Sequence, residues 1–400
     1  MDRIEWLIKS GFHWLNRSAE GPLAKRSELS PWQSELLRAQ VDLRRRSAGR
    51  FPDPSLWLWT ARSLAQSSDW WCAQFKATIY PQNELVVDGC CGAGVDLVAL
   101  SLRGAALGLD RDPELVQLAN SNLAAHDLPA SAILGNVPED VPPKLAWLHI
   151  DPDRRSAAAT SRRLRDADQF SPSLSESLAL ARRARGAIIK LAPGTKLDVD
   201  VEGTFDDTSH GYQRWWLGNL GECRQQLLLT GELPGLASQL SARERTAVLC
   251  EPNANHLLRG LPQPTSGGRD KPLKYIYDCH PVLHASQLQL AWSESEAATA
   301  LGTSQGYFTS DKLIESVWSQ AFEVVEVLPW DKRRVKRWLR ERQMGEVEVK
   351  KRLLRLDANE QQTLLRGKGE NKITLMITRL GDRIRAIAAR RISPGAFPGR

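Results

Sequence analysis

The chain has 400 residues, which is more than one domain usually holds, so two or three domains are expected. Its composition, with 42% apolar and 25% charged residues, is that of a soluble globular protein. No run of about 18 consecutive apolar residues occurs, so we expect no membrane span, and the first residues, Met1–Leu15, have the pattern of an amphipathic helix rather than of a signal peptide.

The six cysteines contain no C-x-x-C pair, so the sequence does not predict a zinc ribbon or a dithiol redox motif, and no metal is expected. The adjacent Cys90 and Cys91 cannot easily form a disulfide with each other. Free thiols in a chain without a secretion signal are typical of a reducing compartment, so we expect the protein in the cytoplasm.

Residues 1–75 are predicted to form a helical N-terminal cap. Apolar residues recur there at helical spacing, and a Pro-containing break, Phe51–Pro54, divides the region. Three tryptophans, Trp57, Trp59 and Trp70, follow the break and predict that the cap packs on the next domain.

From residue 85 onward, short apolar runs alternate with helical stretches, which predicts an α/β domain with a parallel sheet. The predicted strands are Leu85–Asp88, Ala105–Asp110, Ala130–Gly135, Leu145–Asp151 and Gly186–Leu191. The predicted helices are Asp96–Arg103, Pro113–His126 and Ser173–Ala184. Two later runs, Arg214–Asn219 and Cys223–Leu229, predict an antiparallel pair that ends the sheet.

We place this α/β domain at residues 76–250 and a Pro- and Gly-rich linker at residues 251–272. Residues 273–400 are predicted to form a smaller α+β domain. Its expected elements are the strands Phe322–Leu328, Val347–Leu354, Ile373–Thr378 and Ile384–Ala389 and the helix Lys332–Gln343.

The segment Val87–Gly94 joins the first predicted strand of the α/β domain to a helix and contains three glycines. Glycines let the backbone turn sharply and approach a ligand, and the start of the following helix offers free N–H groups. A NAD fingerprint would need Gly or Ala at the position of Leu97, so NAD fits poorly. Asp110 ends the next strand, where an acid can accept hydrogen bonds from both hydroxyls of a ribose.

The ends of four consecutive strands resemble those of class I S-adenosylmethionine (SAM)-dependent methyltransferases: the Gly-rich turn, Asp110, Asn136 and Asp151-Pro152. The resemblance implies a Rossmann-like, seven-stranded methyltransferase sheet with SAM as cofactor. It also implies that Asp88 lies near the methionine end of SAM, Asp110 binds the ribose and Asn136 meets the adenine. The implied cofactor-binding residues are Asp88, Gly89, Cys90, Cys91, Gly92, Gly94, Asp110, Arg111, Asn136, Val137 and Asp151.

The residues around Asp151 bear on the methyl acceptor. Amino-methylating relatives carry Asp/Asn-Pro-Pro and an aromatic, which hold the target amine and stack on the base. This chain reads Asp-Pro-Asp-Arg-Arg from Asp151, so the second proline and the aromatic are missing. The Ser-Cys-Asn-Pro segment of uracil C5 methylation is also missing.

A second resemblance concerns the Lys-Asp-Lys-Glu set of ribose 2′-O-methyltransferases. Four residues match that set by their place relative to the predicted strands, and they are Lys76, Asp151, Lys190 and Glu222. The resemblance implies that Lys190 acts as a neutral-amine base favoured by the nearby Lys76, with Asp151 and Glu222 orienting it.

The last domain resembles the THUMP-like domain that follows a SAM methyltransferase domain in bacterial proteins. The segments that carry this resemblance are Tyr275–Asp278, Gly306–Ser310, Phe322–Trp330 and Glu348–Arg352, with Asp151–Arg155 and Lys190–Pro193 in the preceding domain. True THUMP domains bind structured RNA, so the resemblance implies RNA binding by analogy.

Charge supports the same expectation. Residues 331–355 contain 11 basic and 4 acidic residues, an excess of 7 that equals the net charge of the whole chain, +7. The predicted RNA-binding residues are Arg154, Arg155, Lys332, Arg333, Arg334, Lys336, Arg337, Arg340, Lys350, Lys351 and Arg352.

We therefore predict an enzyme, a SAM-dependent methyltransferase that acts on RNA such as tRNA or rRNA, with the ribose 2′-oxygen as a candidate acceptor. Two alternatives remain open at this point. One is methylation of a base nitrogen through Asp151-Pro152, and the other is a non-catalytic protein that binds SAM and RNA.

Overall fold

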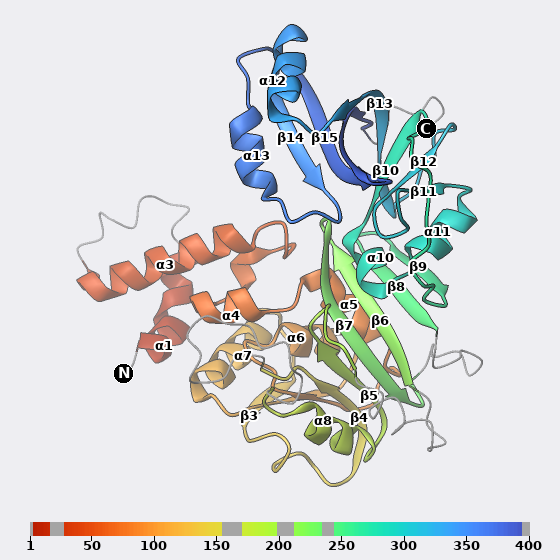
Figure 1. Ribbon diagram of the computed structural model, residues 1–400. Helices are drawn as coiled ribbons and strands as arrows, with labels where there is room; N and C mark the ends of the chain where they lie inside the picture. Colours follow the sequence, from red (N-terminus) through yellow and green to blue (C-terminus); the bar gives the residue numbers. More distant parts are fainter. Residues whose placement is uncertain (1–2, 17–27, 154–169, 198–211, 234–243, 394–400) are drawn as a thin grey trace. The chain divides into compact units, whose positions relative to one another are not determined.

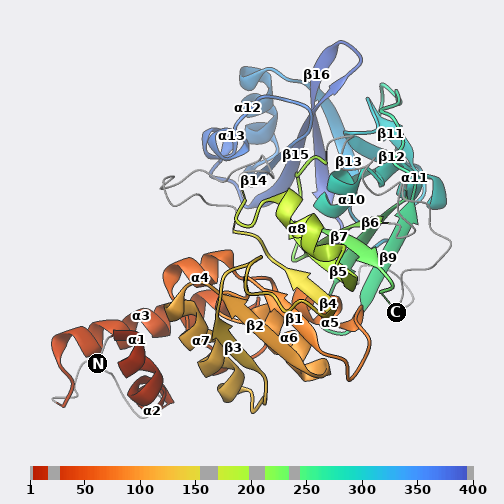
Figure 2. The ribbon, with the colours of Figure 1, turned by 90° about the horizontal axis from the view of Figure 1, so that it is seen from below.

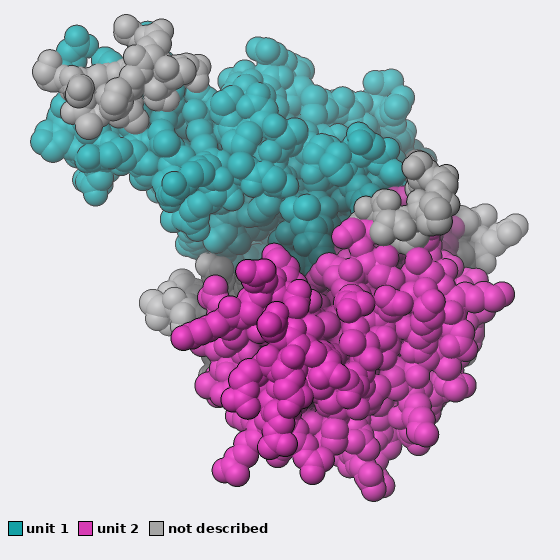
Figure 3. Space-filling view, turned by 90° about the horizontal axis from the view of Figure 1, so that it is seen from above, with its two compact units in different colours: residues 1–244, 248–255 teal, residues 245–247, 256–400 magenta. Residues whose placement is uncertain are grey.

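The computed structural model describes residues 3–16, 28–153, 170–197, 212–233 and 244–393. The chain divides into two compact units. Unit 1 comprises residues 1–244 and 248–255, and unit 2 comprises residues 245–247 and 256–400; Figure 3 colours them separately. Of the predicted site residues, Arg154 and Arg155 lie outside the described ranges.

Unit 1 begins with the helices that the sequence predicts for the N-terminal cap. They are α1 (Arg3–Trp6), the π-helical turn η1 (Leu7–Gly11), α2 (Phe12–Asn16), α3 (Pro31–Ser47), the 3-10 turn η4 (Pro54–Leu56), α4 (Ala61–Gln66) and α5 (Trp70–Thr78). The segment between η4 and α4 is not helical, but it is anchored by its aromatics. Trp57 and Trp59 stack at 5.2 Å between ring centroids, and both are buried in the same core as Trp70.

The sheet at the centre of unit 1 belongs to a nine-stranded order whose last two strands, β8 and β9, include residues of unit 2 (Figure 1). Its strands are β1 (Val86–Gly89), β2 (Ala106–Asp110), β3 (Ser131–Leu134), β4 (Leu145–Ile150), β5 (Ala184–Leu191), β6 (Tyr212–Asn219), β7 (Glu222–Gly231), β8 (Arg245–Cys250) and β9 (Asn255–Gly260). Their order is β3-β2-β1-β4-β5-β7-β6-β8-β9, parallel from β3 to β5, and β7 is antiparallel to both β5 and β6.

The first seven strands of this order are the seven that the sequence predicts. β8 and β9 extend the sheet beyond these seven strands. The predicted Rossmann-like fold is therefore correct, but the predicted sheet has two strands fewer than the sheet of the described residues. β9 lies in the stretch 251–272 that the sequence indicated as a linker. Two further residues of that stretch, Gly267 and Arg269, form β-bridges with Thr303 and Leu301.

Helices cover both faces of the sheet. Successive residues of a strand point to opposite faces, and both sets are apolar here, so both faces must be buried. Val86 and Ile188 join a core with α5, α6 (Val95–Arg103) and α7 (Pro113–Ala125), while Val87 and Ile189 join a core with α8 (Leu174–Ala181). Figure 2 shows α6 and α7 beside β1, β2 and β3. The carboxyl ends of β1 to β4 therefore meet at one edge, where the loops that follow these strands can form a site.

Unit 2 contains a seven-stranded sheet of order β11-β12-β10-β13-β16-β15-β14, mixed because β14 and β15 are parallel. The elements are β10 (Tyr275–Cys279), α10 (Pro281–Ser286), α11 (Gln289–Ser295), β11 (Thr299–Leu301), β12 (Tyr307–Ser310), β13 (Ser319–Pro329), α12 (Lys332–Glu341), β14 (Met344–Lys351), α13 (Ala358–Leu365), β15 (Asn371–Leu380) and β16 (Arg383–Arg391). The helices α12 and α13 pack on one face through a core that includes Val335, Trp338 and Leu339, as the apolar stripe predicted.

The other face of this sheet carries a row of charged side chains. Asp278 of β10 forms ion pairs with Lys350 at 2.9 Å and with Arg352 at 2.7 Å, and only 11% of its side chain is exposed. Burial by itself would raise the pKa of Asp278, but Arg352 and Lys350 outweigh burial and hold that pKa below its ordinary value. The sequence predicted Lys350 and Arg352 as phosphate-binding cations, whereas the structure gives both a carboxylate partner within the unit.

Replacing Asp278 by Asn should remove the carboxylate that Lys350 and Arg352 share. We expect the free energy of unfolding at pH 7 to fall by about 2–4 kcal/mol, because two half-buried cations lose their partner. The depressed pKa means that this contribution is present above the unfolded-state pKa of about 3.9 and is lost as pH falls through the folded-state value.

Denaturant unfolding of wild type and Asp278→Asn between about pH 7 and pH 3 should therefore show a difference that shrinks with acidification. Glu346→Gln is the matched control, because its ion pair with Lys372 is 69% and 75% exposed. We expect it to cost under about 0.5 kcal/mol. Equal losses for the two variants would contradict the role of the Asp278 cluster.

Candidate active site

The Gly-rich turn after β1 adopts the strained backbone that its sequence predicts. Gly92 and Gly94 have φ of +58° and +86°, and Cys90 also has a positive φ of +63°. A Cβ added to Gly92 would have no heavy atom within 4 Å, so the turn is open on that side. A Cβ on Gly94 would approach Ala119 of α7 at 3.1 Å, so this glycine is required by close packing.

A cavity of about 480 Å³ opens at the turn, which is within the size range of small-molecule sites. It is lined by residues that follow the four strands β1 to β4 and by α4 with the residues after it. The predicted cofactor residues that line it are Cys90, Cys91, Gly92, Asp110, Arg111, Asn136, Val137 and Asp151. Asp88, Gly89 and Gly94 belong to the same turn and are buried or partly buried behind its surface.

Asp110 is the last residue of β2, and its carboxylate binds the backbone of the Gly-rich turn. One oxygen of its carboxylate accepts a hydrogen bond from the Gly92 N–H at 2.8 Å, and the other accepts one from the Asp112 N–H at 3.0 Å. Burial raises the pKa of Asp110, although these two backbone hydrogen bonds act in the opposite direction. Each carboxylate oxygen keeps a lone pair for a ligand.

Both ends of the turn are fixed by a buried polar network. Asp88, at the start, accepts a hydrogen bond from Nδ1 of His149 at 2.6 Å, and Nε2 of His149 lies 3.2 Å from Nζ of Lys76. Lys76 in turn pairs with Asp96 of α6 at 2.7 Å, and Asp96 also accepts a hydrogen bond from the Ser68 hydroxyl at 2.6 Å. A lysine ammonium can only donate, so Nε2 of His149 is the acceptor and Nδ1 carries the proton.

The pKa values of the two carboxylates in this network, Asp88 and Asp96, are shifted in opposite directions. Burial raises the pKa of Asp88 above its ordinary value, although His149 opposes that shift. For Asp96, burial acts in the same sense, but Lys76, His149 and Lys190 together outweigh burial, so the pKa of Asp96 is lowered. Asp96 is therefore a permanent anion in the core of the unit, balanced by Lys76.

Of the four residues that match a ribose 2′-O-methyltransferase set, Glu222 lies apart from Lys190. The charges of Lys76 and Lys190 both lower the pKa of Asp96. Asp151 and Lys190 form an ion pair at 2.5 Å beside the cavity. Lys76 is only 1% exposed and belongs to the network behind the turn. Glu222 pairs with Arg224 and is 65% exposed, and the sheet register sets Lys190 opposite Leu227, five residues along β7 from Glu222.

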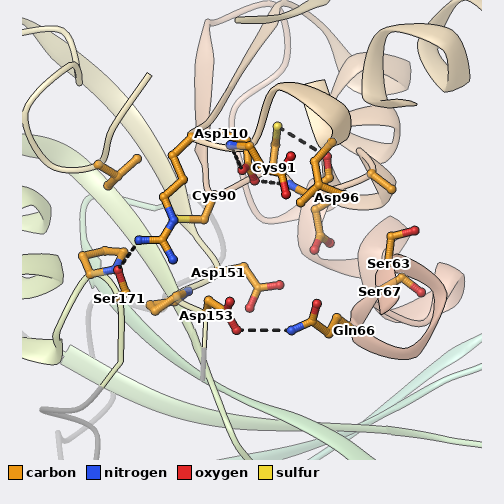
Figure 4. Close-up of a pocket in the computed structure, with 18 of the residues that line it drawn as sticks. Ser63, Gln66, Ser67, Cys90, Cys91, Asp96, Asp110, Asp151, Asp153 and Ser171 are labelled. Atoms are coloured by element: carbon orange, nitrogen blue, oxygen red, sulfur yellow. Dashed lines mark hydrogen bonds between the residues drawn. The ribbon is translucent and has the colours of Figure 1, made fainter. Parts of the chain in front are cut away.

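Several residues of the site were not predicted from the sequence. Asp153 accepts hydrogen bonds from Arg62 at 2.9 Å and from Gln66 at 3.2 Å, which joins α4 to the end of β4, and Figure 4 shows Gln66 bonded to Asp153 with Asp151 beside them. His149 and Asp96 were missed as well. His149 lies inside an apolar strand and Asp96 inside a helix, so neither position carries a sequence signal of its own.

The charge of the cavity is strongly acidic. Its described lining contains seven acidic residues and two basic ones. The acidic residues are Asp96, Asp110, Asp112, Glu139, Asp151, Asp153 and Glu176, and the basic ones are Arg62 and Arg111. Such a lining favours a cationic ligand over an anionic one.

The predicted RNA-binding cations of α12 are on the surface of unit 2. All six are exposed, and no ion pair joins any of them to another residue within the described ranges; they are Lys332, Arg333, Arg334, Lys336, Arg337 and Arg340. Lys351 is exposed as well, and its ammonium donates to the Leu354 carbonyl at 3.1 Å.

The described residues form neither a metal site nor a membrane-spanning helix. They contain no group of three or more His, Cys, Asp or Glu side chains arranged to hold a metal ion. None of the described helices is long and apolar enough to span a membrane. The six cysteines are free thiols.

The burial of the Lys76–Asp96 ion pair predicts how loss of one partner changes the stability of the protein. Lys76→Met would leave Asp96 buried without its cation, and we expect the free energy of unfolding to fall by about 3–5 kcal/mol. Adding Asp96→Asn should recover part of that loss, because the uncompensated charge is then removed. Chemical denaturation of both single variants and the double variant gives the coupling energy.

Lys9→Met is the matched control, because Lys9 pairs with Glu5 on the surface with 63% and 38% of the side chains exposed. That change should cost under about 0.5 kcal/mol. A double variant whose loss equals the sum of the two single losses would show that Lys76 and Asp96 are not coupled.

Comparison with known proteins accounts for both units. Residues 319–391 match the THUMP domain-like family. Over 369 residues the chain is 27% identical to an uncharacterized S-adenosylmethionine-dependent methyltransferase of Mycobacterium tuberculosis, covering 90% of this chain and 95% of that protein, and its counterpart from a second strain matches equally.

A solved structure from Porphyromonas gingivalis, of a protein assigned as a methyltransferase, is similar with a TM-score of 0.74 and 18% identity, covering 98% of this chain and all of that one. At this identity the similarity establishes the fold, and it confirms the predicted Rossmann-like architecture. The chain is therefore similar over nearly its whole length to proteins described as SAM-dependent methyltransferases, and residues 319–391 match a THUMP-like domain.

Proposed function

We propose that the protein binds SAM in the cavity at the ends of β1 to β4 and transfers its methyl group to RNA. The observation that carries this proposal is the convergence of three features on one cavity: the open Gly92 turn, the Asp110 carboxylate and the Asp151–Lys190 pair. The first two suit a nucleoside ligand, and the third suits a methyl acceptor.

The residues present fit SAM. The open side of Gly92 leaves room for a ligand against the backbone, and the turn leads into the N-terminus of α6. Asp110 has lone pairs to accept hydrogen bonds from both ribose hydroxyls, as the resemblance implies. The polar Asn136 and the adjacent Val137 line the part of the cavity where adenine would lie.

The acidic lining supports the same ligand, since seven acidic residues face two basic ones. SAM supplies a methyl group on a positively charged sulfonium, which a nucleophile displaces with loss of the C–S bond. An acidic cavity attracts that cation and repels phosphate, so we infer that only the base or sugar of an RNA acceptor enters it.

Asp151 is the residue that we propose holds the acceptor. Its carboxylate is 27% exposed at the cavity and is fixed from behind by Lys190, which is 8% exposed. A fixed carboxylate accepts a hydrogen bond from an N–H or O–H of the acceptor and so directs its lone pair toward the methyl group.

Two acceptor chemistries follow from the sequence, and the contacts favour one. Ribose 2′-O transfer by the Lys-Asp-Lys-Glu set would require Glu222 near Lys190, but Glu222 pairs with Arg224 and lies five residues along β7 from the residue opposite Lys190. A base nitrogen needs only the Asp151 carboxylate as its hydrogen-bond acceptor. We therefore propose a base nitrogen as the first acceptor to test and the ribose oxygen as the second.

The THUMP-like match and the charges of α12 support RNA as the substrate. Lys332, Arg333 and Arg334 occupy the first turn of α12, which contains no acid, although the helix dipole disfavours cations there. Fold stability therefore gives no reason for these cations, whereas contact with phosphates does.

Methyl transfer from labelled SAM to total RNA from cells lacking the protein tests the function. Asp110→Ala should raise the Kd for SAM by roughly 10-fold or more, because hydrogen bonds to a charged group are lost. Asp151→Ala should leave that Kd within a few-fold and lower kcat by roughly 100-fold, since it misplaces the acceptor. Calorimetry with SAM and initial rates measure the two effects.

Nucleoside analysis of the product then identifies the acceptor. A methylated nucleotide at which alkali still cleaves the RNA backbone supports transfer to a base nitrogen. A backbone that resists alkali at the modified nucleotide supports transfer to the ribose oxygen. Binding of SAM and RNA without any transfer would favour a non-catalytic binding protein. Absence of SAM binding would reject the proposal itself.

Removal of three charges from α12 tests RNA docking. In the Lys336→Gln, Arg337→Gln, Arg340→Gln variant we expect weaker binding of total tRNA at every salt concentration. The slope of log K against log salt should fall by about 1 per contact removed. The same loss of three exposed charges from α3, at Arg38, Arg45 and Arg46, is the control. Equal losses in both variants would indicate a net-charge effect and not a docking surface.

A further inference from the structure

Three side chains at the rim of the cavity form a closed ring of hydrogen bonds. Nη2 of Arg62 donates to Asp153 at 2.9 Å, Nε of Arg62 donates to Gln66 at 3.1 Å, and the Gln66 amide donates to the second oxygen of Asp153 at 3.2 Å. All three residues line the cavity. The guanidinium, the amide and the carboxylate are each planar groups, so the ring joins three flat surfaces.

The chain supports this ring from two sides. Arg62 and Gln66 are one turn apart on α4, which places them on the same face, and the helix begins with a capping box between Thr60 and Ser63. Asp153 is held by two reciprocal backbone hydrogen bonds with Ser171, at 2.9 and 3.0 Å. The ring is therefore fixed before any substrate arrives.

The position of the ring relates it to the acceptor. Asp153 is two residues after Asp151, the carboxylate that we propose holds the acceptor atom, and both line the same cavity. No aromatic side chain occurs among the described residues of that lining. A base held by Asp151 thus meets no aromatic ring within the described part of the site.

We propose that Arg62, held by Asp153 and Gln66, is the platform on which the acceptor base stacks. This inference rests on the proposed function. The hydrogen bonds of Arg62 are made by the edge of its guanidinium, and 60% of its side chain is exposed. A guanidinium plane stacks on nucleobases, and immobilising it beforehand lowers the entropy cost of binding.

Two simpler roles for the ring fit less well. An ion pair as exposed as Arg62–Asp153 adds little to fold stability. Fold stability therefore does not explain why Gln66 also binds both of these side chains. Phosphate binding by Arg62 is opposed by the acidic residues of the lining that form no ion pair with a described residue, which are Asp110, Asp112, Glu139 and Glu176. Stacking on an uncharged base is compatible with both observations.

Substitution of Arg62 separates stacking from charge. We expect Arg62→Ala and Arg62→Lys both to raise the apparent KM for total RNA from cells lacking the protein by about 5- to 150-fold, which corresponds to about 1–3 kcal/mol for one stacked base. Lysine keeps the positive charge but has no planar surface. The Kd for SAM should stay within about twofold of wild type, since stacking concerns only the acceptor.

A rescue variant provides a result that a structural role could not. Arg62→Trp cannot form the ring, but it supplies a flat surface, so it should return the KM to within a few-fold of wild type. Arg185→Lys is the matched control, because Arg185 pairs with Glu232 at 3.1 Å, is 56% exposed and is absent from the cavity lining. It should leave the KM for RNA unchanged.

The outcomes distinguish the inference from the function on which it rests. An unchanged KM in Arg62→Lys, or a failure of Arg62→Trp to restore it, would reject the stacking platform while leaving RNA methylation intact. An increase in the Kd for SAM that matches the rise in KM would assign Arg62 a structural role and also reject the platform. No transfer by the wild-type protein to any RNA would reject both proposals.

Discussion

Lys76 and Asp96 form an ion pair in the core of unit 1, with 2% and 9% of their side chains exposed. Two charges can remain there only because each has further partners, His149 beside Lys76 and Ser68 beside Asp96. Through His149 the network reaches Asp88, so it holds the Gly-rich turn at its first residue and at the helix that follows. Loss of this pair would loosen the loop that shapes the cavity.

The two units carry opposite charges where they would meet ligands. The cavity of unit 1 is acidic, while α12 of unit 2 carries six exposed cations. An acidic cavity attracts the sulfonium of SAM but disfavours the phosphates of an RNA substrate. For the proposed RNA substrate, the attraction would therefore have to come from outside the cavity, and the six cations of α12 provide charge for it.

The sequence predicted those parts of the molecule that local patterns determine. Alternating apolar runs located β1 to β7, and the glycines after Asp88 located the turn, because both depend on backbone geometry. The grouping of Lys76 with Glu222 depended on position along the chain alone. Sheet register decides such contacts, and the sequence does not report it: Lys190 lies opposite Leu227, five residues from Glu222, and Glu222 pairs with Arg224. His149 was missed for the same reason.

The end of β4 places two carboxylates two residues apart, and each already has a cation. Asp151 is paired with Lys190 of β5 and Asp153 with Arg62 of α4. An uncharged acceptor that enters between them meets no unbalanced charge from either pair, so attraction by net charge cannot select it there. Under the proposed function, selection then depends on hydrogen-bond direction at Asp151 and on the flat surface at Arg62, and a base offers both an N–H edge and a planar face.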